Sequence, residues 1–540
     1  MDLLIPGSEW GKDKMNEQQL QHIDPSKFRF VNEDEKLHDK KFEDKPIGFF
    51  KDAWIRFRKS RAAVIAAVII LFIVIFSIVA PFTVRGYDQS FMVTTYSKNP
   101  PRITLWRDLG HKTGYMSRSF SARSLMKALS TGVGALDYTG DEMVSFEQAM
   151  DSNYMPILEI TNEATTIGAD KAEVTTYTAD IETYLEVGFI YKSIEQKELS
   201  DILAWEKEHG KHILYPLVAN NEYCMDATDA NFWYMTDAKG NPLNYNAKGT
   251  KLVKIKEYDP SIVLLDNYKR DADGNPIYYE YTGGGTTETA QYKIRVLYVN
   301  YYEYLYGHEP NYIMGTDAQG RDLMLRLAGG IRLSLLIAVI VSIVNFIIGA
   351  LYGSTEGYYG GAVDLIMERI SDILSGVPFI VVATLFQIHL AKKVGAVPSL
   401  LFAYFTTGWI GTAATVRTQF YRFKNQEYVM AARTLGAKDR RIIWKHIFPN
   451  ALGTIITSAA LVIPRAINEE SMLSYLGIVK LGSAQKTSLG TLLSDASTIW
   501  TNYPHLLFFP ALTLSLLMIC FNLFGNGLRD AFNPALRGTE

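Results

Sequence analysis

The chain has 540 residues, more than one ordinary domain needs, and its formal net charge is −3. So nearly balanced a charge gives no reason to expect nucleic-acid binding. A mean hydropathy of +0.00 conceals an uneven distribution. Long apolar runs occupy residues 61–83 and 333–525, whereas residues 84–310 are polar and acidic. We therefore expect a membrane protein that carries one large polar segment.

Residues 1–60 are hydrophilic and charged, and we expect a cytoplasmic tail followed by an amphipathic segment on the membrane surface. A plain linker explains this region equally well. No cleavable signal peptide is expected, because the first apolar run begins only near residue 61. Basic side chains are frequent between Lys51 and Arg61, directly before residues 61–83. The positive-inside rule therefore places the amino terminus in the cytoplasm and makes residues 61–83 the first transmembrane helix.

Residues 84–310 follow this first span, and we expect them to form an extracellular insertion that buries a core of its own. Ser121–Leu129 and Glu195–Glu208 have helical spacing of apolar residues. Lys251–Tyr258 and Gln291–Tyr302 alternate in the manner of strands. The prediction for this segment is an inserted α+β domain.

Two similar phrases within the insertion predict turns. Asp-Ala-Lys-Gly-Asn-Pro at residues 237–242 is followed by Asp-Ala-Asp-Gly-Asn-Pro at residues 271–276, and Gly and Pro favour turns between strands. Cys224 is the only cysteine of the segment, so no internal disulfide is expected. The tyrosines within Tyr298–Tyr306 fit either an aromatic surface for a protein partner or an edge strand packed on its own domain.

Candidate catalytic and metal-binding patterns in the insertion are weak. Ser-Leu-Met-Lys at 124–127 and Lys-Thr-Gly at 112–114 stand in the wrong order for a penicillin-binding site, and chance explains them. His209 and His212 lie beside glutamates at a helix end without a clear further metal ligand, so a solvated face is the preferred interpretation. The acidic phrase at 271–275 lacks the glutamate that a calcium loop needs, and a turn is preferred.

A glycine-containing motif precedes the second long apolar run, and it comprises Gly315, Thr316, Asp317, Gly320, Arg321 and Asp322. We expect Asp317 to cap a helix or to turn the chain. A short helix is expected from Arg321 to Arg326 on the outer surface, before the second span begins.

The membrane-embedded core is expected at residues 311–530 and the carboxyl-terminal cytoplasmic tail at 531–540. Its five spans are predicted at residues 333–352, 373–390, 397–416, 451–467 and 506–524. With the first span this makes six transmembrane helices, so both termini lie in the cytoplasm. Asp364, Glu368 and Asp372 should form one polar stripe that faces water or a partner.

The loop 417–450 is strongly basic, which places it on the cytoplasmic side. Four residues at i, i+3, i+4 and i+7 share one face of a short helix there, and the two central ones are small: Tyr428, Ala431, Ala432 and Leu435. Asn425 could cap this helix and Gly436 suits its end. Asp439 can cap a second helix, which Pro449 should interrupt. A helix, a glycine bend and a second helix result, and we interpret them as a docking surface.

This stretch closely resembles the EAA coupling motif of permease subunits in ATP-binding-cassette importers. The residues that carry the resemblance are Glu427, Tyr428, Ala431, Ala432, Arg433, Leu435, Gly436 and Ala437. The Gly315–Asp322 motif is similar to an outer-face motif of the oligopeptide, dipeptide and nickel branch, second-permease type. The likeness covers residues 50–101 and 308–537 and not the insertion, because relatives normally have a short loop there.

The resemblance implies an all-α polytopic membrane protein of the type I importer class, whose glycine bend fits a groove on an ATPase subunit. It also implies a second, homologous permease subunit, two ATPase subunits and an external peptide-binding protein as partners. No G-x-x-x-x-G-K-[ST] phosphate loop occurs, so ATP and magnesium should belong to the ATPase subunits, and no cofactor or metal is expected on this chain. We expect a transport subunit and not an enzyme.

Import of peptides is the leading hypothesis. The same machinery could move nickel or another small solute, because the motifs report on coupling and not on cargo. A different class of protein is a membrane-anchored extracellular binding or enzyme domain, but a simple anchor has no need of the cytoplasmic bend. The insertion is expected to contact the peptide-binding protein or to cap the entrance.

Overall fold

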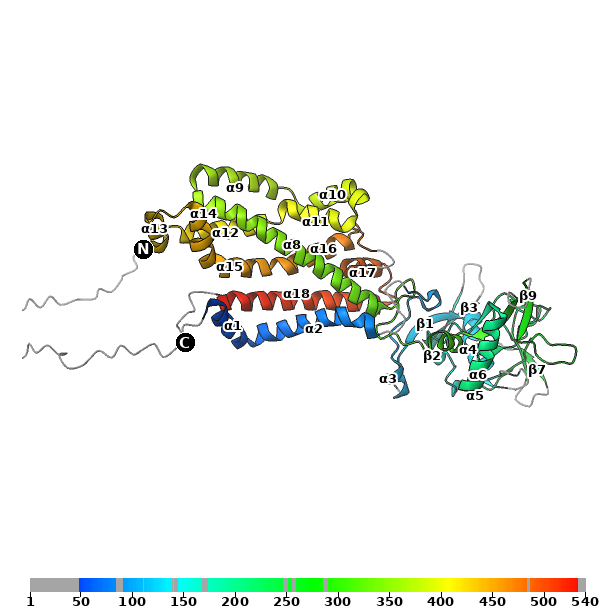
Figure 1. Ribbon diagram of the computed structural model, residues 1–540. Helices are drawn as coiled ribbons and strands as arrows, with labels where there is room; N and C mark the ends of the chain where they lie inside the picture. Colours follow the sequence, from blue (N-terminus) through cyan, green and yellow to red (C-terminus); the bar gives the residue numbers. More distant parts are fainter. Residues whose placement is uncertain are drawn as a thin grey trace, which may run out of the picture. The chain divides into compact units, whose positions relative to one another are not determined.

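The computed structural model describes residues 48–83, 91–109, 111–137, 139, 144–167, 173–245, 251–254, 259–284, 290–482 and 486–532 (Figure 1). The predicted tails at 1–47 and 533–540 lie outside these residues. Two units meet at Ile55 and Arg56, within the short helix α1 (Phe49–Lys59). The second unit contains the helical bundle and the segment 84–310, which we call the insert.

The bundle consists of α-helices and one short π-helical segment, η4, in chain order α2 (Arg61–Thr83), α8 (Leu323–Tyr359), α9 (Gly361–Ser375), α10 (Phe379–Val394), α11 (Ala396–Thr407), α12 (Ile410–Phe423), α13 (Glu427–Thr434), α14 (Asp439–Arg441), η4 (Ile442–Ile447), α15 (Phe448–Ala460), α16 (Val462–Tyr475), α17 (Leu489–Ala496) and α18 (Pro504–Phe532). The long helices α2, α8 and α18 pack along one another (Figure 1). Their shared core includes Ile73, Ile337, Val341, Ile467 and Leu517.

Four helical runs of the described chain are long and apolar enough to cross a membrane: α2, α8, the continuous run Asp439–Tyr475 and α18. The first span is therefore found where it was predicted. A fifth span results if α9 and α10 count as one, although they bend by 72°. The predicted span 397–416 is divided between α11 and α12, which a break at Gly408 and Trp409 separates. The pair α11 and α12 is not among the candidate spans. Length and composition therefore give at most five spans in the described chain, and not the six that were predicted.

The prediction of a separate short helix from Arg321 to Arg326 is wrong. Leu323 begins a single 37-residue helix, α8, which continues through the predicted span to Tyr359. The reason is that nothing in this stretch breaks the helix: the side chain of Asp322 caps its start, and Gly329 and Gly330 are tolerated because they are buried in packed surroundings.

The insert contains both helices and strands. Its helices are η3 (Thr94–Tyr96, a 3₁₀ turn), α3 (Thr104–Asp108), α4 (Ala122–Leu136), α5 (Phe146–Met150), α6 (Gln196–His209) and α7 (Tyr298–Tyr306). Its strands are β1 (Tyr115–Ser121), β2 (Ile157–Ile167), β3 (Glu173–Glu182), β4 (Phe189–Glu195), β5 (Leu214–Tyr215), β6 (Leu243–Tyr245), β7 (Leu252–Lys254), β8 (Val263–Leu264), β9 (Tyr279–Gly283) and β10 (Gln291–Leu297).

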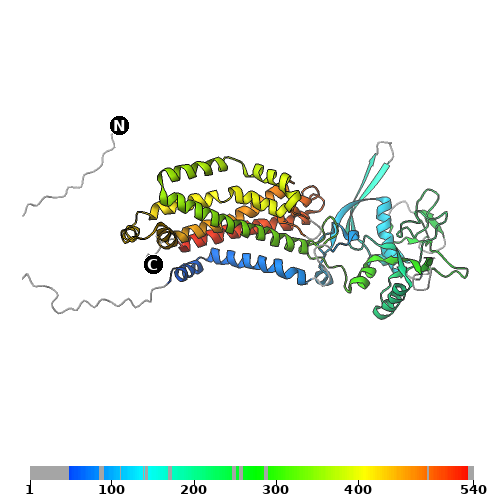
Figure 2. The same ribbon diagram turned by 45° about the horizontal axis from the view of Figure 1, so that its top comes forward.

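In the described part of the insert, the strand pairs are antiparallel. The first sheet has the order β1-β3-β2, and its β2–β3 hairpin extends away from the rest of the insert (Figure 2). The second sheet centres on β10, which pairs with β4, β5 and β9, and the third has the order β7-β6-β8. Two hydrophobic cores fill the insert, one around Phe146, Ile181 and Trp233 and the other around Tyr184 and Ile294. The insert thus buries cores of its own, as predicted.

Several local predictions for the insert are confirmed. Helices α4 and α6 cover the two stretches with helical spacing. The phrase at 237–242 forms a turn in which the amide of Asp237 donates to the carbonyl of Asn241 at 2.8 Å, and the phrase at 271–276 repeats it between Asp271 and Asn275 at 2.9 Å. Strand β7 begins the predicted strand 251–258, whose residues 255–258 lie outside the described chain.

The tyrosine-rich stretch was assigned wrongly. Residues 298–302 do not continue a strand, because Tyr298–Tyr306 forms helix α7, and β10 before it is the central strand of its sheet and not an edge. Tyr298, Tyr301 and Tyr302 are buried at i, i+3 and i+4, so they pack into the core and do not offer an aromatic surface.

Candidate functional site

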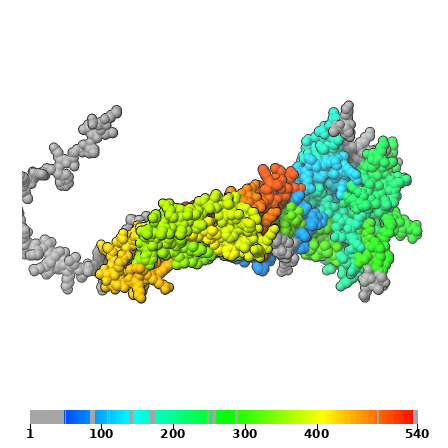
Figure 3. Space-filling model, turned by 90° about the horizontal axis from the view of Figure 1, so that it is seen from above, coloured from blue at the N-terminus to red at the C-terminus, as the bar shows by residue number. Residues whose placement is uncertain are grey.

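A helical hairpin made by α13 and α14 lies at one end of the bundle, drawn in gold in Figure 3. Its bend is Gly436, whose φ of +77° is a left-handed conformation that favours glycine. The amide of Gly436 donates to the carbonyl of Arg433 at 3.0 Å, and the amide of Ala437 donates to the carbonyl of Ala432 at 3.1 Å. These two hydrogen bonds form a Schellman motif, so Gly436 ends the helix as predicted.

Helix α13 presents one face to the bundle and one outward. Val429 is 0% exposed and Ala432 is 9% exposed, whereas Tyr428 is 40% and Leu435 is 87% exposed. Ala431 is exposed as well. The outward face is therefore formed by Tyr428, Ala431 and Leu435. The prediction that Ala432 shares this face is wrong, because the helix turns Ala432 toward the bundle together with Val429.

The predicted caps of the hairpin are also corrected. Gln426 and not Asn425 precedes α13, and no side chain caps it. Lys438 precedes α14, which makes Asp439 the first helical residue. Pro449 does not interrupt the second helix: the π-helical segment Ile442–Ile447 precedes it, and the chain remains helical. A π segment shifts the backbone hydrogen bonds, which accommodates a proline that lacks an amide hydrogen.

The hairpin is anchored firmly to the bundle. Its inner residues pack in a core that also contains Phe420 of α12 and Tyr358 of α8. The Tyr358 hydroxyl donates to the Asp439 carboxylate at 2.6 Å, and the Arg433 guanidinium lies 5.9 Å from the centre of the Tyr358 ring. A displacement of the hairpin must therefore also move the end of α8 and the end of α12.

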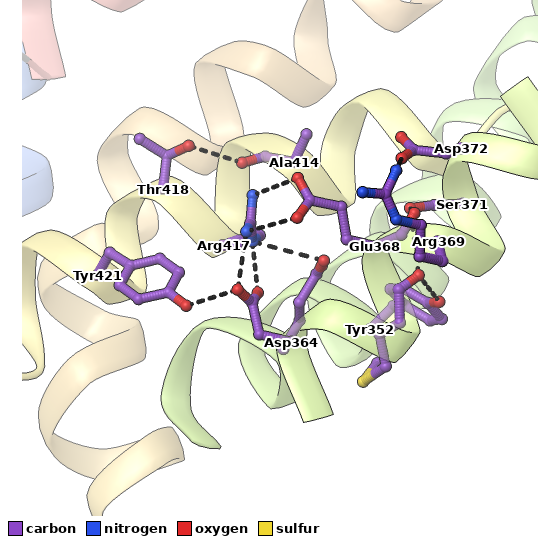
Figure 4. Close-up of polar contacts among 12 residues, drawn as sticks. Tyr352, Asp364, Glu368, Arg369, Ser371, Asp372, Ala414, Arg417, Thr418 and Tyr421 are labelled. Atoms are coloured by element: carbon purple, nitrogen blue, oxygen red, sulfur yellow. Dashed lines mark hydrogen bonds and ion pairs between the residues drawn. The ribbon is translucent and has the colours of Figure 1, made fainter. Parts of the chain in front are cut away.

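Arg417 of α12 contacts acidic side chains of two other helices (Figure 4). Its guanidinium contacts both oxygens of Asp364, at 2.6 and 2.8 Å, and both oxygens of Glu368, each at 3.0 Å. Glu356 of α8 lies 3.5 Å from the same side chain. The Tyr421 hydroxyl donates to Asp364 at 2.8 Å. Paired contacts of this kind fix orientation as well as position, so α8, α9 and α12 are held together by one arginine.

The predicted polar stripe on α9 therefore needs correction. Asp364 is turned to Arg417 and is largely covered. Glu368 also pairs with Arg417, but its side chain remains 41% exposed, and Asp372 lies in an exposed pair with Arg369 at 3.3 Å. Sequence reasoning missed the Arg417 cluster. Its signal was the i, i+4 spacing of Asp364 and Glu368 together with a single arginine at the end of the fourth predicted span.

The outer-face motif is an internal seam. The amide of Thr316 donates to the carbonyl of Asn99 at 3.0 Å, the amide of Asn99 returns a hydrogen bond to the Thr316 hydroxyl at 2.8 Å, and that hydroxyl donates to the carbonyl of Tyr96. Gly315 and Gly320 are both buried. An added Cβ at Gly315 would lie 2.5 Å from the carbonyl oxygen of Asn99, and one at Gly320 would collide with the carbonyl of Val93. The motif thus fastens residues 93–99 to the start of α8.

Asp317 and Asp322 have separate tasks within this seam. Asp317 turns the chain, as predicted: its carboxylate accepts from the amides of Gln319 and Arg321, both at 2.9 Å, and pairs with the Arg321 side chain at 2.8 Å. Asp322 caps α8 by accepting from the amides of Met324 and Leu325. Burial raises the pKa of the Asp322 carboxyl to about 6, even though these amides favour its charged form.

The weak metal candidates of the insert have local explanations. The His209 ring stacks on Trp205 with 4.3 Å between ring centres. The Asp271 carboxylate accepts from the amides of Asp273 and Asn275, at 3.0 and 2.8 Å, within its own turn. The described residues contain no group of three or more histidine, cysteine, aspartate or glutamate side chains placed to hold a metal ion.

Comparison with known proteins adds family information to this geometry. Residues 345–538 match the binding-protein-dependent transport system inner membrane component, and residues 48–101 match the N-terminal transmembrane domain of oligopeptide transport permease C. The oligopeptide transport system permease protein OppC of Bacillus subtilis is 44% identical over 223 residues, which are 41% of this chain and 72% of that protein.

Two further relatives agree. The dipeptide transport system permease protein DppC of Bacillus subtilis is 43% identical over 225 residues, or 41% of this chain and 68% of that protein. The OppC protein of Haemophilus influenzae is 43% identical over 228 residues, or 42% of this chain and 71% of that protein. Residues 102–344 lie outside both family matches, so the insert from residue 102 onward is not covered by either match.

Apolar helices of spanning length and these matches together define a multi-pass membrane permease of the ATP-binding-cassette importer class. Within that class, the chain belongs to the oligopeptide and dipeptide transport permeases and is of the second-permease, OppC-like type.

Proposed function

We propose that this chain is a permease subunit that imports oligopeptides or dipeptides across the bacterial cytoplasmic membrane, coupled to separate ATPase subunits through residues 427–450. One observation carries the proposal: the hairpin is anchored on its inner face and leaves Leu435, 87% exposed, at the tip of its outer face. Leu435 follows the last residue of α13 and lies on the same outward face as Tyr428 and Ala431, and an exposed apolar patch held in a fixed position marks a protein-interaction site.

The coupling mechanism follows from the anchoring. A closing ATPase pair would push on Tyr428, Ala431 and Leu435. The hairpin would pass this displacement to α8 through Tyr358 and Asp439, and to α12 through the core around Phe420. The helical bundle of this chain would switch between two conformations. ATP and magnesium would bind to the ATPase subunits. The permease itself would carry out no chemical step.

We propose a topology of six spans with both termini in the cytoplasm and the insert outside the cell. In this topology α9 with α10 forms the third span and α11 with α12 the fourth. Bent and interrupted helices are tolerated in membranes where neighbouring helices satisfy the freed backbone groups. The basic residues of the hairpin region support its cytoplasmic position.

The remaining subunits are proposed from the family. A homologous second permease would complete the pathway, two ATPases would drive it and an external peptide-binding protein would deliver the substrate. Peptides are preferred to nickel because the relatives described above carry oligopeptide and dipeptide in their names.

The insert would contact the peptide-binding protein or cap the entrance. Its two ends lie side by side, because Arg102 pairs with Tyr312 and Met92 pairs with Arg321 as isolated β-bridges. A variant that lacks residues 103–305, with a short loop restored, tests this role by peptide uptake and by docking of the binding protein. Reduced docking is expected, whereas unchanged docking and uptake would reject the role.

The coupling proposal is tested by Gly436→Val in the complete transporter. The outward face should be misaligned because a β-branched residue resists φ of +77°, so we expect ATP-driven peptide uptake to fall at least tenfold while the protein stays in the membrane. Gly240→Val is the matched control, since Gly240 has φ of +80° and, like Gly436, no atom within 4 Å of an added Cβ. Normal uptake by the Gly436 variant would count against the docking role.

A further inference from the structure

A polar cavity of about 480 Å³ lies within the bundle, among residues of α8, α9, α10, α11, α12, α15 and α16. Its volume falls within the range of about 300–1,000 Å³ that is usual for small-molecule sites. The lining includes hydroxyl and amide groups of Asn345, Thr407, Thr412 and Ser458, and it contains one basic and one acidic side chain, Arg465 and Glu469.

Arg465 and Glu469 stand one turn apart on α16 and form a loose pair, with 3.5 Å between Nε and Oε1. Their side chains are 76% and 34% exposed, so both can reach a molecule in the cavity. The neighbouring Glu470 differs. It is fully buried and accepts from the hydroxyls of Ser334 and Ser474, at 2.8 and 3.0 Å. Glu470 holds helices together, and Glu469 is available for a ligand.

The position of this pair requires an explanation. Both residues lie in the apolar run Asp439–Tyr475, and a charge within a membrane span faces a water-filled path or a partner because lipid disfavours it. The cavity wall also holds an unused acceptor: Asn345 is 1% exposed, and no group among the described residues donates to its Oδ1. An acceptor buried without a donor costs free energy unless a ligand or water supplies one.

We propose that this cavity is a peptide-binding subsite on the transport path, where Glu469 receives the ammonium group of a short peptide and Arg465 receives its carboxylate. The inference rests on the proposed function and adds the groups that recognise the substrate. A zwitterion replaces each partner of the resting ion pair with a charge of the same sign, so no charge is left unpaired in the bundle. An extended dipeptide spans at most about 7 Å, a length that two side chains one helical turn apart can bracket.

The test compares uptake of radiolabelled Ala-Ala with that of N-acetyl-Ala-Ala and of Ala-Ala amide by the whole transporter in proteoliposomes. Glu469→Gln should reduce the preference for Ala-Ala over the acetylated peptide at least tenfold and leave the preference over the amide within threefold. Arg465→Gln should do the reverse. The same binding protein serves every variant, so its own selectivity cancels from these ratios.

Arg369→Gln is the control, because Arg369 forms an exposed pair with Asp372 outside the cavity, and both preferences should remain those of the wild type. A double variant, Arg465→Glu with Glu469→Arg, keeps an ion pair and covers the case in which single variants fail to assemble. It should lower both preferences. Wild-type preferences in the Gln variants or in the double variant would show that the pair is structural or faces the partner permease, which would overturn the inference. Absence of any ATP-driven uptake by the wild-type transporter would instead reject the proposed function.

Discussion

The α13–α14 hairpin and the outer-face motif both depend on glycines with positive φ, but they use them in opposite ways. At Gly436 an added Cβ meets nothing within 4 Å, and the bend is open to solvent. At Gly315 and Gly320 an added Cβ would run into the backbone of residues 93–100. In the hairpin, glycine permits a bend that displays other side chains. In the outer-face motif, glycine permits two backbones to touch.

This difference separates an exposed bend, for which we propose a partner, from a buried one that is packed against its own chain. Thr316, Asp317 and Asp322 are buried in the seam with residues 93–99, so their motif needs no other subunit to explain it. Among the described residues, Ala431 and Leu435 are exposed, and Tyr428 is 40% exposed with one hydrogen bond, which its hydroxyl accepts from Asn450. The two motifs resemble the family equally well in the sequence, but this does not mean that both bind another subunit.

Replacing each glycine with alanine gives the largest expected contrast. Gly320→Ala should lower the free energy of unfolding by about 3 kcal/mol or more, because it adds a backbone collision to the left-handed strain. Gly436→Ala should lower it by only about 1–2 kcal/mol, the strain alone. Thermal unfolding of the two purified variants measures the difference. Equal losses would mean that the seam yields to the added methyl group, and the comparison would fail.

The buried carboxyl of Asp322 should make the stability of the seam depend on pH. Its folded-state pKa is raised from the ordinary 3.8 to about 6, so its contribution to stability is fully present below pH 3.8 and is lost as the pH rises through 6. Asp322→Asn keeps a capping side chain and removes this charge. At pH 8 the variant should exceed the wild type by up to about 3 kcal/mol in unfolding free energy, and the gain should disappear near pH 4. A difference that is the same at both pH values would contradict the buried-carboxyl account.

The two faces of α13 provide a smaller contrast within the hairpin itself. Val429→Ala removes two methyl groups from a fully buried position and should cost about 1.5–3 kcal/mol of stability. Leu435→Ala removes a side chain that is 87% exposed and should change stability by less than about 0.5 kcal/mol. Peptide uptake should nevertheless fall in the Leu435 variant, because the docking surface loses its tip. Unfolding and uptake measured on both variants separate packing from docking, and a stable Leu435 variant with full uptake would argue against the outward face.

Local features of the fold could be predicted from the sequence, whereas contacts between distant segments could not. The first span, the end of α13 at Gly436, the turn at Asp317 and the two insert turns each depend on a few neighbouring residues. The inward direction of Ala432 depends on the core around Phe420 and Tyr358. The helical spacing of residues shows which of them share a face of the helix, but it does not show which face packs against the bundle.

The Arg417 cluster illustrates the same limit. Asp364 and Arg417 are 53 residues apart in the sequence and are joined only when α9 packs against α12. Helix α7 was missed for a different reason, since Tyr298–Tyr302 follows a strand without a turn signal and tyrosine is common in strands. Its burial pattern at i, i+3 and i+4 became visible only in the packed insert.

Photo-crosslinking from position 435 tests the central claim most directly. A photoreactive phenylalanine analogue in place of Leu435, in the assembled transporter, should form an adduct with an ATPase subunit, because this side chain is the exposed tip of the hairpin. The same analogue at Leu252 in the insert, where the side chain is 50% exposed, should form none. An assembled, transport-active complex in which position 435 never reaches an ATPase would contradict the account.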